Sequence, residues 1–235
     1  MFYRVGQSFQ QIVDFILPPR CINCERSGQL LCAECQAELT WMKSPICDVC
    51  GRPSRSAQLV CDGCLQNRPA YHTTRATLLF VAPLPTIIHQ FKYYNSFALA
   101  RPLAEAMASA WMDWRPADQV DWVCPIPLHP DRLKERGYNQ SALLAYHFSQ
   151  IVNLPYTDVL LHRTKNTPPQ ARLDRAKRIE NVRDAFAVGH GDLTGKHILL
   201  VDDVCTTGAT LDAAALCLRS AGAQNVSAYC LARAA

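Results

Sequence analysis

The apolar residues in the last third of the chain alternate between strand and helix patterns. Four consecutive apolar residues, Ile198 to Val201, predict a buried strand over 197–204. A helical pattern follows over 210–221 and ends at Gly222, since glycine is common at helix C-termini. An apolar run then predicts a last strand over 226–231. A strand, a helix and a strand in this order predict a parallel α/β sheet.

The middle of the chain continues this alternation. The patterns predict a helix over 85–114, a strand over 120–128 that ends in a Pro-x-Pro turn, a helix from its cap at Asn139 to about 151, a strand over 158–162, a basic loop and helix over 168–183, and a strand over 185–188. We therefore expect an α/β domain over residues 71–235.

The first twenty residues have a different pattern. Their apolar side chains recur at roughly helical spacing, which predicts an amphipathic helix over 1–20 that Pro18 and Pro19 end. Such a helix packs on its own protein or, alternatively, lies on a membrane surface. No apolar run approaches the roughly 20 residues that span a bilayer, and the sequence shows no secretory signal. We expect a cytoplasmic protein without a transmembrane segment.

Eight of the twelve cysteines form four Cys-x-x-Cys pairs between residues 21 and 64. Two such pairs supply the four thiolates of a tetrahedral zinc site, so the eight cysteines predict two structural zinc ions. A disulfide framework requires an oxidising compartment, which nothing in the sequence indicates. A redox pair requires one such motif beside a βαβ unit rather than four in succession. An iron–sulfur cluster is the remaining alternative.

The assignment of cysteines to the two sites is a separate prediction. We favour sequential sites, formed by Cys21, Cys24, Cys32 and Cys35 and by Cys47, Cys50, Cys61 and Cys64. A crossed or nested arrangement stays open. The segment has few core residues, so zinc binding, worth about 10–16 kcal/mol in zinc-finger peptides, is expected to fold it. Residues 21–70 are thus a predicted double zinc ribbon, which binds nucleic acid or protein or supports its neighbour.

The predicted strand over 197–204 leads into a segment suited to a phosphorylated sugar. Its two carboxylates, Asp202 and Asp203, suit sugar hydroxyls or a metal ion that bridges to pyrophosphate. The turn after them opens a helix, whose N-terminal N–H groups and dipole attract an anion. This turn contains Thr206, Thr207, Gly208, Ala209 and Thr210. The segment therefore fits a ribose 5-phosphate at the carboxyl end of a strand.

The net charge of +4 is mild and does not by itself indicate nucleic-acid binding. Cations are nevertheless concentrated between His129 and Arg183, where ten lysines or arginines accompany five aspartates or glutamates. This excess favours an anionic ligand, although a solvated helix face has the same composition. Lys92, taken alone, is typical of a surface lysine.

Three stretches resemble known proteins. Residues 198–210 are similar to the signature with which type I phosphoribosyltransferases bind phosphoribosyl pyrophosphate (PRPP). Two further stretches resemble ComF-type competence proteins and their GntX-like relatives, which also begin with a cysteine-rich zinc module. The first contains Pro125, Ile126, Pro127, Leu128, His129, Arg132 and residues 136–140, and the second contains Arg163, Thr167, Gln170, Leu173, Arg178, Asn181, Ala185 and Phe186. The resemblance covers nearly the whole chain. One departure is Cys205, a position where these proteins more often have an aliphatic residue.

The resemblance implies a type I phosphoribosyltransferase fold and specific roles. Asp202 and Asp203 would contact the ribose hydroxyls and order Mg²⁺, and residues 206–210 would hold the 5-phosphate. The turn of Pro125, Ile126 and Pro127 would lie under the pyrophosphate, with Arg136 also among the PRPP-binding residues. Arg163 and Lys165 would belong to a mobile loop that neutralises the leaving pyrophosphate.

Three functions remain open at this point. The first is an enzyme that transfers ribose 5-phosphate from PRPP to an acceptor. The second is a protein that binds PRPP as a signal without turnover. The third is a factor that handles single-stranded DNA or contacts DNA-uptake proteins, since the resemblance points to natural transformation. The sequence leaves the acceptor and the oligomeric state open.

Overall fold

The computed structural model describes residues 18–54, 58–94, 96–114, 119–166 and 184–234. The basic helix expected over 168–183 lies outside these residues, as does nearly all of the amphipathic helix expected over 1–20. The same holds for five residues of the family resemblance: Thr167, Gln170, Leu173, Arg178 and Asn181.

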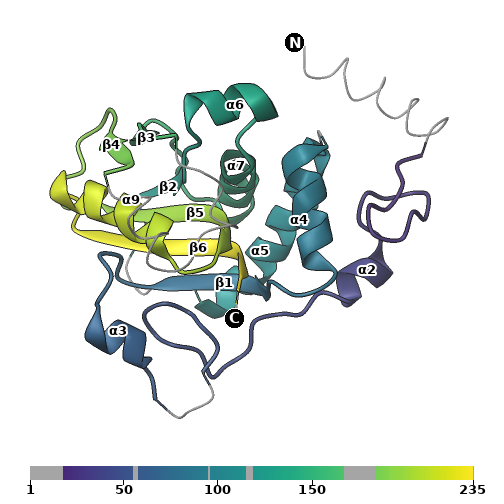
Figure 1. Ribbon diagram of the computed structural model, residues 1–235, viewed down its shortest axis with the longest axis horizontal. Helices are drawn as coiled ribbons and strands as arrows, with labels where there is room; N and C mark the ends of the chain where they lie inside the picture. Colours follow the sequence, from purple (N-terminus) through teal and green to yellow (C-terminus); the bar gives the residue numbers. More distant parts are fainter. Residues whose placement is uncertain (1–17, 55–57, 95, 115–118, 167–183, 235) are drawn as a thin grey trace.

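The centre of the fold is a sheet of four parallel strands in the order β1-β6-β5-β2 (Figure 1). The strands are β1 (Thr74–Leu79), β2 (Trp122–Pro125), β5 (His197–Cys205) and β6 (Asn225–Arg233). The two central strands are the longest and are almost wholly buried, as expected for a sheet covered on both faces. The predicted parallel α/β fold is confirmed, whereas β1 was not anticipated from the sequence.

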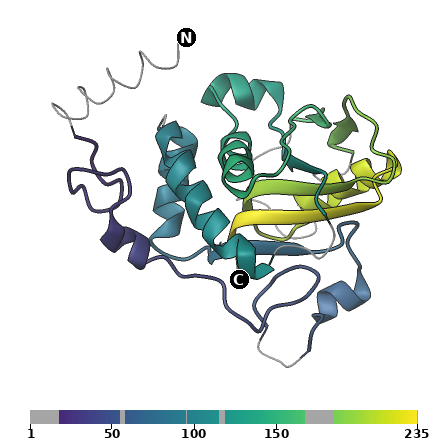
Figure 2. The same cartoon turned by 180° about the vertical axis from the view of Figure 1, so that it is seen from behind.

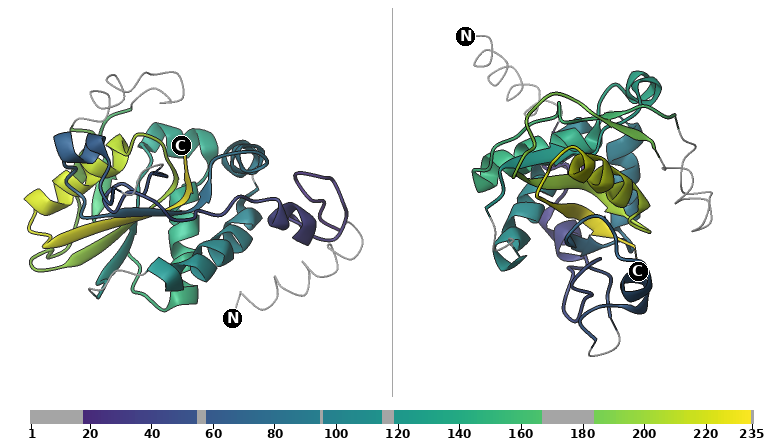
Figure 3. Two further views of the ribbon diagram at one scale, coloured as in Figure 1. Left: turned by 90° about the horizontal axis from the view of Figure 1, so that it is seen from below. Right: turned by 90° about the vertical axis from the view of Figure 1, so that its left-hand side faces the viewer.

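Helices cover the two faces of this sheet separately (Figure 3). Side chains alternate along β5, so Leu199 and Val201 pack with helices α4, α5 and α7, while Ile198 and Leu200 pack with α9. The helices are α4 (Leu84–Tyr93), α5 (Ala100–Trp114), α7 (Gln140–Val152) and α9 (Ala209–Ser220). Two buried layers therefore meet at the central strands.

The single helix expected over 85–114 is wrong, because the structure divides it into α4, the 3₁₀ turn η1 (Phe97–Leu99) and α5. One straight helix of that length would extend about 45 Å, farther than a compact domain can cover. The break lets the apolar faces of both helices pack in one core, with Phe91 and Met107 completely buried.

The strands expected near 158–162 and 185–188 do not join the main sheet. They appear as β3 (Leu161–Arg163) and β4 (Phe186–Val188), which pair with each other in an antiparallel ribbon. Both strands are short, with three residues each, and Leu161 and Phe186 are buried beside α9. A short helix, α6 (Pro130–Arg136), was also not anticipated.

The two cysteine-rich segments lie at separate places against the domain (Figures 1 and 2). The first, with α2 (Ala33–Ala37), packs into the core formed by α4 and α5. The second, with α3 (Asp62–Gln66), packs into the core of α9. Between them, residues 40–42 run along the outer edge of β1 and exchange backbone hydrogen bonds with Thr77 and Leu79. This segment protects an otherwise open sheet edge.

No helix within the described ranges is both long enough and apolar enough to cross a membrane.

Candidate functional site

Asp202 and Asp203 lie near the carboxyl end of β5, with exposed fractions of 9% and 4%. The Oδ1 atom of Asp202 accepts hydrogen bonds from Ser141 Oγ at 2.8 Å and from the backbone N–H of Asp203 at 2.9 Å. Burial, followed by the neighbouring charge of Asp203, raises the pKa of Asp202 to about 7. A carboxyl group near its pKa at neutral pH can exchange a proton as its surroundings change.

Lys92 reaches this carboxylate pair from α4. Its ammonium Nζ lies 2.5 Å from Asp203 Oδ2, and only 23% of its side chain is exposed. Its expected character as a surface lysine is therefore wrong. The sequence held a signal, because Lys92 follows Ile88 by four residues and so lies on the face of α4 that is buried. The lysine offsets one of two adjacent negative charges.

The turn after β5 has the geometry of an anion site. Gly208 has a φ of +86° and precedes α9, so the chain reverses sharply into the helix. Thr207 Oγ1 accepts a hydrogen bond of 3.3 Å from the backbone N–H of Ala209. The helix has twelve residues, and the turn that leads into it follows directly in the chain after β5, the strand with the two carboxylates. Residues 206–210, hereafter the phosphate loop, thus combine hydroxyls with a helix N-terminus.

The predicted Pro-x-Pro turn lies next to β5. The backbone N–H of Ile126, between Pro125 and Pro127, donates to the carbonyl of Val201 at 2.9 Å. Asn139 then ties this turn to α7, because its Nδ2 donates to the carbonyl of Ile126 and its Oδ1 accepts from the N–H of Ser141, both at 3.0 Å. One side chain thereby aligns the turn with the serine that contacts Asp202.

The remaining predicted cations occupy different surroundings. Arg136 lies 5.0 Å from the ring centroid of Tyr93, the residue after Lys92, and its guanidinium also donates to Gln140. Arg163 is mostly buried, which lowers its pKa, while the carboxylate of Asp202 acts to raise it.

Arg163 is thus within electrostatic range of the carboxylate pair. Lys165 is half exposed, with its Nζ 3.9 Å from the carboxylate of Asp184. Of these two cations, Arg163 is the one for which an electrostatic interaction with Asp202 is described.

The cysteines form two groups of four in sequential order: Cys21, Cys24, Cys32 and Cys35, and Cys47, Cys50, Cys61 and Cys64. This is the arrangement that we favoured from the sequence. Within each group the sulfur atoms lie within 4.8 Å of one another. Tetrahedral zinc with Zn–S bonds of about 2.3 Å places its sulfur atoms about 3.8 Å apart. The Sγ–Sγ distances of 3.5 Å between Cys24 and Cys32 and of 3.7 Å between Cys50 and Cys61 are close to this value.

Backbone amides support the thiolates of both groups. The N–H of Cys32 donates to Cys21 Sγ at 3.5 Å, and the N–H of Cys61 donates to Cys47 Sγ at 3.3 Å. Burial opposes ionisation of Cys47, yet hydrogen bonds from the backbone of Cys50, Cys61 and Val49 lower its pKa to about 6. Both donor sets therefore fit zinc.

Comparison with known proteins gives two family matches, a double zinc ribbon domain over residues 12–65 and a phosphoribosyl transferase domain over residues 139–235. Competence protein F of Haemophilus influenzae is 31% identical over 92% of this chain and 97% of its own length. The DNA utilization protein YhgH of Escherichia coli K12 is 30% identical over 86% and 90% of the two chains. Competence protein ComFC of Bacillus subtilis is 28% identical over 91% and 88%.

Among solved structures, the chain is similar to the glutamine PRPP amidotransferase of B. subtilis, with 20% identity and a TM-score of 0.40. The similarity covers 60% of this chain and 30% of the larger enzyme.

Proposed function

Because the chain belongs to the family of competence protein F, we propose that it binds PRPP where β5 meets α9 and transfers the ribose 5-phosphate group to an acceptor. One observation carries the proposal: a buried pair of carboxylates lies beside the phosphate loop at the carboxyl end of a central strand. This is where open α/β sheets bind their ligands. The matching phosphoribosyl transferase domain supports the same assignment.

Each part of the proposed site has a distinct task. The N–H groups and hydroxyls of the phosphate loop bind the 5-phosphate, and the carboxylates of Asp202 and Asp203 accept hydrogen bonds from the ribose hydroxyls. Carboxylate oxygens also suit Mg²⁺, which when bound with PRPP would balance the charge of the pyrophosphate. Arg163 stabilises the negative charge that develops on the leaving pyrophosphate.

Lys92 resolves a conflict within this site. Two ionised carboxylates would repel a ligand with several phosphate charges, yet the ligand needs them as hydrogen-bond acceptors. The ion pair of Lys92 with Asp203, together with the raised pKa of Asp202, reduces the negative charge of the free site. The site can therefore admit an anion before the sugar hydroxyls engage the carboxylates.

Transfer is tested by pyrophosphate release from PRPP in the presence of bases, amines and nucleic acids as acceptors. We expect release that depends on PRPP and on one acceptor, and that Asp202→Asn abolishes. If no acceptor supports release but Mg²⁺·PRPP still raises the melting temperature of the wild-type protein, the site binds PRPP without turnover. If neither occurs, the PRPP assignment is wrong.

A second function, contact with single-stranded nucleic acid, is favoured by a groove of about 710 Å³ between the second cysteine group and α5. Trp41, Trp114, Lys43 and Arg75 line this groove, and aromatic rings beside cations suit stacked bases and phosphates. Relatives of the chain carry the names competence protein and DNA utilization protein. Retention on single-stranded DNA should fall steeply as salt rises, and Trp41→Ala should weaken it. Absent or salt-independent retention would exclude this function.

A further inference from the structure

Arg233, near the end of β6, is completely buried although it carries a permanent positive charge. Its Nη1 donates to the sulfur of Cys205 on the neighbouring strand. Its Nε and Nη2 atoms have no hydrogen-bond partner among the described residues. A guanidinium has five N–H donors, and burying them unpaired is costly. An anionic group close by is therefore required to hold this side chain in place.

The second cysteine group is a source of such charge in addition to the sulfur of Cys205. Arg233 lines a pocket of about 110 Å³ together with Cys50, Cys64, Thr207 and Gly208, so the cysteines and the phosphate loop share one wall with it. Four thiolates around one Zn²⁺ carry a net charge of about −2. Zinc at this group thus makes burial of the guanidinium favourable.

The net charge of the second cysteine group depends on the metal, because zinc holds all four sulfur atoms as thiolates. Loss of zinc therefore removes this charge from the pocket and leaves Arg233 with the sulfur of Cys205, which its Nη1 contacts. A buried charge that loses one of its partners is destabilising.

Strand pairing carries this effect to the phosphate loop. Arg233 lies opposite Cys205 in the β5–β6 register, and the N–H of Ala234 donates to the carbonyl of Cys205 at 3.0 Å. Cys205 directly precedes Thr206, the first residue of the phosphate loop. A displacement of Arg233 therefore acts on the residue from which the loop begins.

The segment after the second cysteine group also holds the start of α9. A Cβ atom on Gly208 would lie 3.0 Å from the hydroxyl of Tyr71, so the two residues are in close contact. The N–H of Ala70 donates to the carboxylate of Asp212 at 2.6 Å, and Arg219 donates to the carbonyl of Ala70 at 3.1 Å. These contacts join the segment after the second cysteine group to both ends of α9.

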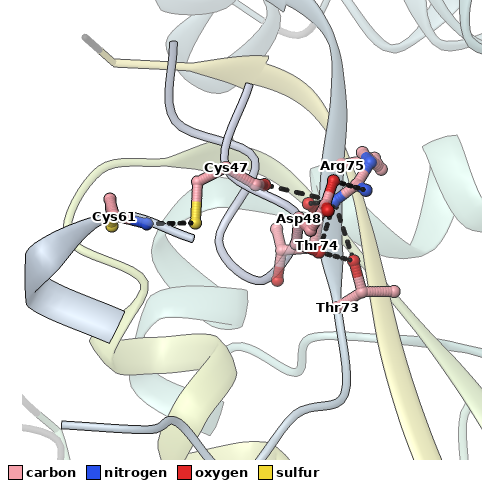
Figure 4. A network of polar contacts seen from close by, with 6 residues as sticks. All are labelled: Cys47, Asp48, Cys61, Thr73, Thr74 and Arg75. Atoms are coloured by element: carbon pink, nitrogen blue, oxygen red, sulfur yellow. Dashed lines mark hydrogen bonds and ion pairs between the residues drawn. The ribbon is translucent and has the colours of Figure 1, made fainter. Parts of the chain in front are cut away.

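Arg75 fixes the same cysteine group to the sheet (Figure 4). Its guanidinium on β1 donates to the carbonyl of Asp48 at 2.9 Å and to Thr73 Oγ1 at 2.8 Å, while Cys61 N–H contacts Cys47 Sγ. The second group is thus anchored to β1, the strand that pairs with β6. The first group packs instead into the core beside α4 and α5.

We infer that Arg233 is a positioning residue that couples the second zinc site to the phosphate loop, so that zinc at the second site, and not at the first, sets the loop for ligand binding. The part that concerns ligand affinity rests on the proposed function. The coupling of zinc to the order of the loop does not depend on it.

The test uses the full, zinc-loaded chain with Arg233→Met, Arg233→Lys and, as a matched control, Arg26→Met. Arg26 is an arginine beside the first cysteine group that is paired with Glu34 and mostly exposed. Hydrogen exchange over residues 205–212 reports the loop, and transfer of zinc to a chelator reports the metal. We expect Arg233→Met to speed both the hydrogen exchange of the loop and the transfer of zinc to the chelator. Arg233→Lys should restore much of the protection of the loop against exchange, and Arg26→Met should leave loop exchange unchanged. Equal loop protection in Arg233→Met and Arg26→Met would overturn the inference.

A second pair of variants keeps Arg233 and removes one ligand from each site. Cys61→Ser should increase exchange in the loop and weaken PRPP binding by about tenfold, a typical coupling between sites, whereas Cys24→Ser should do neither. If both variants affect the loop equally, the coupling is not specific and the inference fails. If wild-type protein binds no PRPP, the proposed function fails, while the exchange data still decide the coupling.

Discussion

Charged side chains that are withdrawn from water determine the chemistry of the β5–α9 junction. Asp202 and Asp203 are buried next to each other, and Lys92 and Ser141 reach them from two different helices. Burying like charges is unfavourable for folding, and the ligand binding that we propose accounts for this cost.

The raised pKa of Asp202 gives a prediction about stability. Because the folded-state pKa of about 7 lies above the ordinary 3.8, folding favours the protonated carboxyl, and this stabilisation is lost as the pH rises through about 7. Asparagine cannot ionise. Relative to wild type, Asp202→Asn should therefore gain stability between about pH 4 and about pH 7 and then level off, with a total effect on the order of a few kcal/mol.

Denaturant unfolding at several pH values measures this difference. Asp113→Asn, which changes an exposed aspartate at the end of α5, serves as the control and should show no such rise. A stability difference for Asp202→Asn that does not vary with pH would show that the carboxyl is ionised throughout this range.

Residue chemistry was only partly predictable from the sequence. The two aspartates and the threonine-rich turn are adjacent in the chain, so a local pattern sufficed to propose them. Lys92, Ser141 and Arg233 act through partners far away in sequence, such as Ser141 and Asp202, which are 61 residues apart. Local sequence patterns do not contain such contacts. From the sequence alone, an arginine on the buried face of a strand is indistinguishable from one on its exposed face.

Strands β5 and β6 and helix α9 formed where their apolar runs predicted, because long buried elements have strong periodic signals. Strand β1 was missed, since its mixed sequence becomes a strand only by pairing with β6 on one side and residues 40–42 on the other. The two short strands β3 and β4 were recognised, but their antiparallel pairing depends on tertiary contacts.

The junction of the second cysteine group with β1 depends on Gly51. Its φ is +63°, and a Cβ atom there would lie 2.4 Å from the backbone carbonyl oxygen of Thr74. Gly51→Ala should lower the free energy of unfolding by about 3 kcal/mol or more, because backbone strain and a clash combine. Gly195→Ala is the matched control, with a φ of +72° and open space around the Cβ, and should cost only about 1–2 kcal/mol.

Thermal or denaturant unfolding with metal analysis distinguishes the two variants. Gly51→Ala should also lose zinc more readily, since the turn containing Gly51 follows Cys50 directly. Equal destabilisation of both variants would mean that the second cysteine group is not packed tightly on β1.

At the scale of the whole molecule, the cysteine groups are built into the domain rather than appended to it. Cys21 and Cys35 belong to one core beside α4 and α5, and Cys50 and Cys64 belong to the other beside α9. The sequence indicated a zinc module before the domain, but its docking on both cores required the three-dimensional structure.

Metal analysis of the purified chain should therefore give about two zinc ions per molecule. Removal of both with a chelator should lower the melting temperature of the entire domain, because each zinc site shares a core with the sheet. One ion per chain, or a chelated protein with an unchanged melting temperature, would contradict this account.

The central claim is that the carboxylates and the phosphate loop form a site for PRPP, and calorimetric titration of the zinc-loaded protein with PRPP and Mg²⁺ tests it most directly. We predict saturable single-site binding that Asp202→Asn abolishes and Asp113→Asn leaves intact. No heat of binding in the wild-type protein, or equal binding by Asp202→Asn, would show that this junction is not the PRPP site.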